Sequence, residues 1–199
     1  EIRDALAYLK VIHNQNDEVS LHRIINTPRR GIGKTSLMKA NEYCQETHLP
    51  LFKVMMGARK YERIPKDSAF TMEMFTGIIS NYQQRFANEV LGTVFKDLLD
   101  EIGYLRFLET QSGDVKARER RVMNVHELLV SVRKYSEKFP EATLQSYLER
   151  VTLFTQSDND PESKGNQVSI MTLHSAKGLE FPFVFMVGMS EGVFPNNRA

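Results

Sequence analysis

The chain has 199 residues, enough for one sizeable domain or for a domain with part of a second. Its composition, 41% hydrophobic and 26% charged, is typical of a globular protein and excludes a disordered or fibrous one. The longest apolar stretches fall far short of the roughly 20 residues that cross a bilayer, and no signal peptide opens the sequence, so we expect a cytoplasmic protein with no membrane partner.

The first predicted element is a helix over residues 2–11, where apolar residues recur at helical spacing. After it, the letters GKT in TPRRGIGKTS, residues 27–36, suggest a phosphate-binding P-loop. A P-loop needs Gly five residues before the Gly of GK, and here that position is Pro28. A P-loop also follows a buried strand, whereas residues 21–26, which precede this segment, follow helical sequence. The segment therefore does not predict nucleotide binding.

A turn of the helix-hairpin-helix type fits this segment better. Gly31 and Gly33 would let the backbone approach a DNA phosphate, and the N–H groups of a helix that starts at Thr35 or Ser36 would meet the anion. The net charge of +1 is no argument for nucleic acid, but the charges cluster. Between Val19 and Asn41 there is no Asp or Glu, and the basic residues there are Arg23, Arg29, Arg30, Lys34 and Lys39.

The turn therefore predicts duplex DNA contacts that ignore base sequence and weaken with salt. The expected contact residues are Arg29, Arg30, Gly31, Ile32, Gly33, Lys34 and Thr35. The alternative is a tight turn between helices with a solvated basic face. A second basic run, residues 116–121, is interpreted as a solvated helix face.

Further helices are predicted over residues 35–46, 67–88, 90–102 and 122–139. Pro140 stops the last of these, and Thr143 can cap a helix over residues 144–154. The single cysteine, Cys44, excludes a disulfide within the chain, and its helical setting favours a small buried hydrophobe. Residues 1–156 are therefore predicted to form an all-helical domain.

Residues 157–167, SDNDPESKGNQ, lack apolar side chains and are predicted to be an exposed linker. Beyond them, residues 168–173 and 181–187 are short apolar runs joined by a polar turn, and they predict two strands of a parallel sheet. Two strands cannot complete such a sheet. The predicted fold class is mainly α: a helical domain followed by a short α/β segment, residues 168–199, that is part of something larger.

The stretch VSIMTLHSAKGLEFPFVFMVGMSEGVFP, residues 168–195, resembles motif V of the UvrD/PcrA/Rep-like superfamily 1A DNA helicases. EIRDALAYLKVI, residues 1–12, resembles the point where these helicases leave motor domain 2A for the helical insertion 2B, and the PRRGIG turn resembles the element of 2B that touches duplex DNA. By this resemblance, residues 1–156 are subdomain 2B, which binds DNA or regulates the motor. Residues 168–199 are part of domain 2A.

The resemblance also implies roles for residues around the polar turn of the tail. Thr172, His174 and Lys177 would hold the single strand, and Glu180 and Gly178 would contact ATP, with Glu180 at the ribose. For Lys177 and Gly178 the alternative is a tight turn with a surface charge. For His174 it is a surface histidine with ordinary partners.

The whole protein is then expected to be an ATP- and Mg²⁺-dependent 3′–5′ DNA helicase of repair or replication, cytoplasmic, bacterial and nucleoid-associated. Its expected partners are single-strand/duplex junctions, the remainder of the motor, and repair or replication proteins. The sequence contains no Walker A loop, Walker B acids or arginine finger, so we expect this part alone to bind no ATP or Mg²⁺ and to be inactive. The alternative is a helical autoregulatory or protein-interaction module with incidental DNA affinity.

Overall fold

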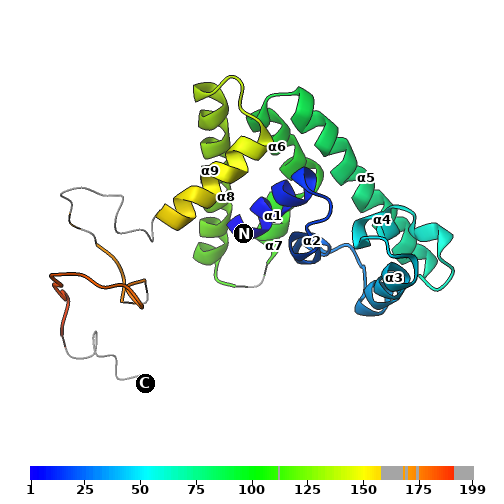
Figure 1. Ribbon diagram of the computed structural model, residues 1–199, viewed down its shortest axis with the longest axis horizontal. Helices are drawn as coiled ribbons and strands as arrows, with labels where there is room; N and C mark the ends of the chain where they lie inside the picture. Colours follow the sequence, from blue (N-terminus) through cyan, green and yellow to red (C-terminus); the bar gives the residue numbers. More distant parts are fainter. Residues whose placement is uncertain (112, 158–167, 169, 174, 191–199) are drawn as a thin grey trace. The chain divides into compact units, whose positions relative to one another are not determined.

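The computed structural model describes residues 1–111, 113–157, 168, 170–173 and 175–190. Contacts along the chain divide it into two units, Glu1–Asp158 and Asn159–Ala199. The first unit is helical (Figure 1). Its elements are α1 (Ile2–His13), α2 (Glu18–Ile24), α3 (Lys34–Thr47), α4 (Leu51–Met56), the short 3-10 helix η1 (Ala58–Lys60), α5 (Lys66–Asn88), α6 (Leu91–Glu101), α7 (Tyr104–Thr110), α8 (Val115–Lys138) and α9 (Leu144–Ser157).

Helix α1 is the centre of the first unit. Apolar residues occupy more than one of its faces, which is the pattern of a helix that is covered on several sides. Accordingly it packs against α2, α5, α8 and α9. Its buried side chains are Ala5, Ala7, Tyr8, Leu9, Val11 and Ile12.

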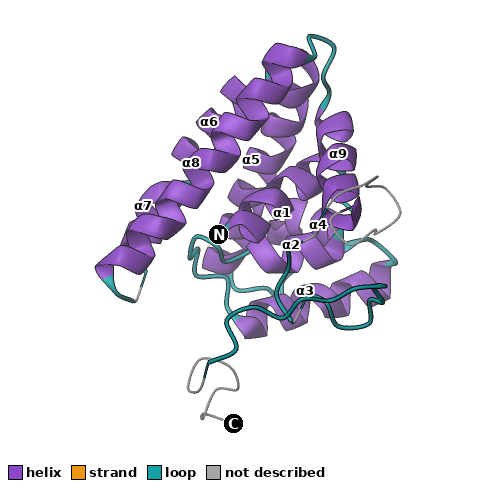
Figure 2. Ribbon diagram, turned by 90° about the vertical axis from the view of Figure 1, so that its left-hand side faces the viewer, coloured by secondary structure: helices purple, strands orange, loops and turns teal. Residues whose placement is uncertain are grey.

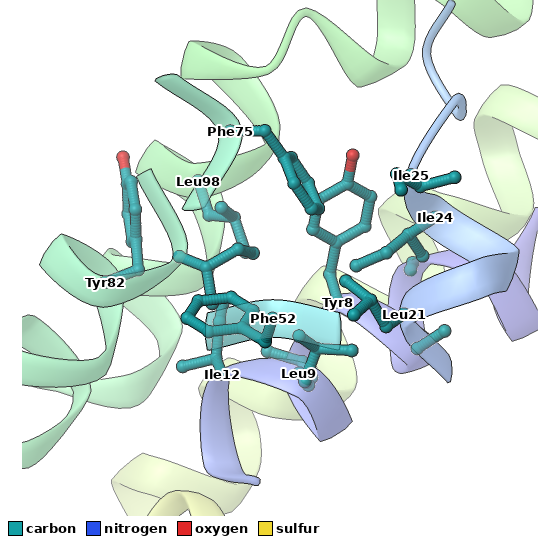
Figure 3. Close-up of a cluster of buried hydrophobic side chains, with 14 of the residues drawn as sticks. Tyr8, Leu9, Ile12, Leu21, Ile24, Ile25, Phe52, Phe75, Tyr82 and Leu98 are labelled. Atoms are coloured by element: carbon teal, nitrogen blue, oxygen red, sulfur yellow. The ribbon is translucent and has the colours of Figure 1, made fainter. Parts of the chain in front are cut away.

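The core around α1 is rich in large side chains from helices far apart in the sequence (Figure 3). Tyr8 of α1 is completely buried and meets the ring of Phe75 of α5 edge-on, with ring centroids 6.5 Å apart. The ring of Tyr104 of α7 also meets that of Tyr8 edge-on, with ring centroids 6.4 Å apart. Burial of such rings stabilises the unit by about 1.5–3 kcal/mol each, so the helices are fixed relative to one another at this point.

Helix α5 joins two parts of the first unit, since it packs against α4 and η1 as well as against α1 and α6 (Figure 2). Helices α6 and α8 lie very close at Gly92. A Cβ atom there would be only 2.9 Å from the Cα of Arg133, so glycine is what permits this approach.

The predicted long helices agree with the structure, and all but one of their ends differ by three residues or fewer. The helix predicted over 122–139 begins earlier, at Val115. The predicted cap of α9 is confirmed, because the Ser146 amide donates to the Thr143 hydroxyl at 3.1 Å. Helices α2, α4 and α7 were not predicted. Each has seven residues or fewer, too short to show a helical period.

The predicted α/β segment is wrong. Residues 168, 170–173 and 181–190 contain no strand in the structure, and most of their apolar side chains are exposed: Ile170 is 95% accessible and Phe183 is 85% accessible. Apolar, β-branched composition reports a preference for a half-buried pleated surface, and without neighbouring strands to complete the hydrogen bonds two short runs do not form a sheet. None of the helices in the described ranges is long and apolar enough to span a bilayer.

Candidate nucleic-acid interface

The basic segment singled out in the sequence is the connection between α2 and α3. Helix α2 begins at the Asp17 cap, whose carboxylate accepts from the Ser20 amide at 3.0 Å. The chain then turns through a cis Thr27–Pro28 bond, and Gly31 has a positive φ of 77° that favours glycine. Gly33 caps α3, which starts at Lys34. The turn therefore connects two helices, and the element directly before it is helix α2, where a P-loop would require a buried strand.

Arg30 lies on the core side of the turn. Its Nη1 donates to the carbonyls of Ile24, Ile25 and Pro28 at 2.9, 3.3 and 3.1 Å. Its Nη2 donates to the Tyr8 hydroxyl. The guanidinium carbon also lies 4.7 Å from the centroid of the Phe75 ring, within the range of a cation–π interaction.

Two further side chains hold the turn from inside. The Tyr8 hydroxyl donates to the Thr27 carbonyl at 2.6 Å. Asn26 pairs with the backbone of Ile32 in both directions: its Oδ1 accepts from the Ile32 amide at 3.2 Å, and its Nδ2 donates to the Ile32 carbonyl. Ile32 itself is buried, so both halves of the turn are anchored.

The outer side of the turn carries the polar groups that can meet an anion. Arg29, Lys34 and Thr35 are exposed, as are the backbones of Gly31 and Gly33. The first turn of α3 has no acidic residue, and its cap Gly33 offers no side-chain acceptor. The amides at the start of α3 thus remain donors with the positive end of the helix dipole behind them.

The turn's positive charge is smaller than the sequence suggests. Arg23 forms an ion pair with Asp4, and Arg30 donates to the protein's own carbonyls. Within the described ranges, no ion pair involves Arg29, Lys34 or Lys39. These three side chains are the charges available to a ligand.

In the second unit, Thr172 organises a short turn. Its hydroxyl accepts from the Ser175 amide at 3.2 Å, and its carbonyl accepts from the Ala176 amide at 3.0 Å. Gly178 has a positive φ of 84°. Lys177 and Glu180 are exposed. His174, predicted to hold the single strand, lies outside the described residues.

A comparison with protein-family models matches the UvrD-like helicase C-terminal domain over residues 1–199. The chain belongs to this family. Among curated relatives of this UvrD-like domain, a probable DNA helicase II homolog of Rickettsia conorii is 35% identical over 199 residues, all of this chain and 29% of the relative. The ATP-dependent DNA helicase PcrA of Bacillus subtilis is 32% identical over 204 residues, again all of this chain and 27% of the relative. The chain thus spans less than a third of the length of these helicases.

The structure of this UvrD-like domain divides the predicted duplex contacts into two groups. Arg29, Gly31, Gly33, Lys34 and Thr35 lie on the outer side, whereas Ile32 is buried and Arg30 is half-buried. Sequence reasoning missed Tyr8 and Asn26, which shape the turn. Asn26 stands next to the turn and could have been suspected as a turn residue. For Tyr8, in another helix, the sequence gives no such signal.

Proposed function

We propose that this UvrD-like domain is the part of an ATP-dependent 3′–5′ DNA helicase that grips duplex DNA with its first unit and senses nucleotide with its second. One observation supports the grip above all others: the outer side of the 27–33 turn presents Arg29, Lys34 and the uncapped start of α3, and no carboxylate occurs between Val19 and Asn41. Backbone amides and basic side chains recognise phosphates.

The expected ligand is the phosphate backbone at a junction of duplex and single strand. Phosphates carry no base identity, so binding is independent of sequence, and each phosphate neutralised releases counterions. Helicases act on any sequence, and such contacts suit that requirement. The named relatives are DNA helicases, which supports DNA over another polyanion.

For the second unit we extend the proposal to the turn at Thr172. Thr172, His174 and Lys177 would contact the single strand, and Glu180 would accept a hydrogen bond from the ribose of ATP, with Gly178 shaping the loop between them. The exposed Glu180 carboxylate and the positive φ of Gly178 fit such a loop. In the whole helicase, hydrolysis of Mg²⁺-bound ATP would supply the free energy for stepping. Of the ATP contacts in the whole helicase, we assign only the one at the ribose to a side chain of this chain.

The grip is tested by titrating the chain into a labelled duplex with a 3′ single-stranded tail and following fluorescence anisotropy at several salt concentrations. We expect salt-sensitive binding that ATP does not alter, because we expect this part to bind no ATP without the remainder of the motor. The double variant Arg29→Ala/Lys34→Ala should bind more weakly and should lower the slope of log affinity against log salt by about 1.8, or about 0.9 per phosphate.

The matched control removes the same charge from the exposed face of α8, with Lys116→Ala/Arg120→Ala. It should leave the slope near that of the wild type. Equal binding by the wild type and the Arg29/Lys34 variant would contradict the proposal. The basic turn would then be a solvated surface, and the regulatory or protein-interaction role would stand.

A further inference from the structure

The two adjacent arginines of the turn have opposite surroundings. Arg29 is exposed, whereas the guanidinium of Arg30 meets three carbonyls, one hydroxyl and the face of Phe75. A guanidinium has five N–H donors in a rigid fork. With both terminal nitrogens of Arg30 donating inward, a phosphate would have to compete with bonds already made.

The groups that Arg30 joins belong to different parts of the fold. The carbonyls of Ile24 and Ile25 mark the end of α2, and that of Pro28 belongs to the turn. The Tyr8 hydroxyl comes from the central helix α1, and the Phe75 ring comes from α5 (Figure 3). One side chain therefore ties the turn to three helices.

Tyr8 completes this connection because its hydroxyl has two roles. It accepts from Arg30 and donates to the Thr27 carbonyl at 2.6 Å. Donation requires the neutral phenol, and burial raises the pKa of Tyr8 to about 12, against a smaller lowering by Arg30. The hydroxyl consequently keeps its proton at neutral pH.

From this geometry we infer that Arg30 is a positioning residue: it does not touch DNA, but holds the 27–33 turn in the shape that presents Arg29, Lys34 and the start of α3. The inference rests on the proposed DNA grip and deepens it. A turn fixed before binding loses less conformational freedom when it meets the backbone of DNA, so its affinity is higher. The positive charge of Arg30 is then incidental to binding, and its fork geometry is essential.

Substitutions that keep or remove the charge of Arg30 distinguish a residue that contacts phosphate from one that positions the turn. Arg30→Ala and Arg30→Lys should both weaken duplex binding, by about tenfold, because lysine cannot reproduce the fork; the salt slope should stay near that of the wild type. At the neighbouring position, Arg29→Ala should lower the slope by about 0.9 and Arg29→Lys should restore it. A slope lowered by about 0.9 in Arg30→Ala, with wild-type slope and affinity in Arg30→Lys, would overturn the inference, since it would make Arg30 a phosphate contact.

Tyr8→Phe keeps the test valid if the Arg30 variants unfold. It removes a single buried hydroxyl and no charge, and Phe fills the same space. We expect the variant to retain its helical circular dichroism and to bind DNA about fivefold more weakly. Wild-type affinity in a folded Tyr8→Phe would contradict the inference, because the connection from α1 to the turn would then have no effect on the grip.

A third measurement distinguishes failure of the inference from failure of the proposed function. Amide hydrogen exchange at Ile32, whose N–H is bonded to Asn26, reports the turn without DNA. If the wild-type chain binds no DNA, the proposed function falls. Even then, faster exchange at Ile32 in Arg30→Lys at an unchanged melting temperature would show that Arg30 holds the turn. Unchanged exchange at Ile32 would overturn the positioning role of Arg30.

Discussion

At the scale of single residues, Tyr8 couples the core to the turn. Its ring packs against Phe75 and Tyr104, and its hydroxyl reaches Thr27 and Arg30. A buried hydroxyl is favourable only when it is hydrogen-bonded. The same side chain thus contributes apolar burial to α1 and fixes one end of the turn.

Tyr8 also predicts how stability depends on alkaline pH. Burial raises its pKa in the folded state to about 12, from an ordinary value near 10. Below pH 10 both states are protonated, so stability is unaffected. Between pH 10 and 12 the unfolded state loses the proton and the folded state keeps it, which favours unfolding as pH rises.

The raised pKa of Tyr8 is expected to lower the free energy of unfolding by roughly 2–3 kcal/mol by pH 12. It is measured as the difference in the free energy of urea unfolding between the wild type and Tyr8→Phe at a series of pH values. Other buried tyrosines away from Tyr8, such as Tyr147, also have raised pKa values and affect both proteins alike. If the difference in unfolding free energy stays constant from pH 9 to pH 12, the pKa of Tyr8 is not raised in the folded state.

At the scale of elements, the sequence predicts helices long enough to show a repeating apolar pattern. It misses elements that form only because neighbouring parts of the fold pack against them. Long amphipathic helices such as α5 show several periods, so their faces and approximate ends are predictable. Helices α2, α4 and α7 form because the core covers them, and this information lies outside their own residues. The two predicted strands failed for the same reason, since a strand depends on its neighbours.

The candidate site follows the same division. The glycines and the missing carboxylates mark the turn and its outer side in the sequence. Arg29 and Arg30 are indistinguishable there, however, because only the carbonyls of Ile24 and Pro28 and the hydroxyl of Tyr8 decide which arginine turns inward. Such contacts join residues from separate helices and leave no local pattern.

The close approach of α6 and α8 gives a prediction about elements. In Gly92→Ala the new Cβ would lie 2.9 Å from the Cα of Arg133, so one helix must shift, and we expect a loss of about 1–3 kcal/mol. The matched control is Gly77→Ala in the interior of α5, where a Cβ meets nothing within 4 Å. There alanine should stabilise by about 0.5–1 kcal/mol through its helix propensity.

Urea denaturation measures both variants. The test is whether the two variants change the stability in opposite directions, because helix propensity alone predicts that both alanines stabilise the protein. A Gly92→Ala protein at least as stable as the wild type would show that the space between α6 and α8 is larger than the structure gives.

At the scale of the whole molecule, the two units have different surfaces. The first buries a core built from residues between Ala5 and Leu148. In the second, the described apolar side chains are largely exposed, with Val168 at 92% and Phe185 at 88%. Exposed apolar surface of this extent is typical of a face that another protein surface covers. The proposed division, grip in the first unit and nucleotide sensing in the second, places the two roles in parts that differ in how much of their apolar surface is buried.

This difference predicts the behaviour of a shortened chain. Because the core lies within the first unit, residues 1–157 alone should keep the helical circular dichroism and the melting temperature of the 199-residue chain. A lower melting temperature for residues 1–157 than for the 199-residue chain would contradict this prediction.

The 199-residue chain should self-associate as its concentration rises, through apolar side chains such as Phe183 and Phe185, and light scattering measures this. The variant Phe183→Glu/Phe185→Glu should remain monomeric at concentrations where the wild type associates.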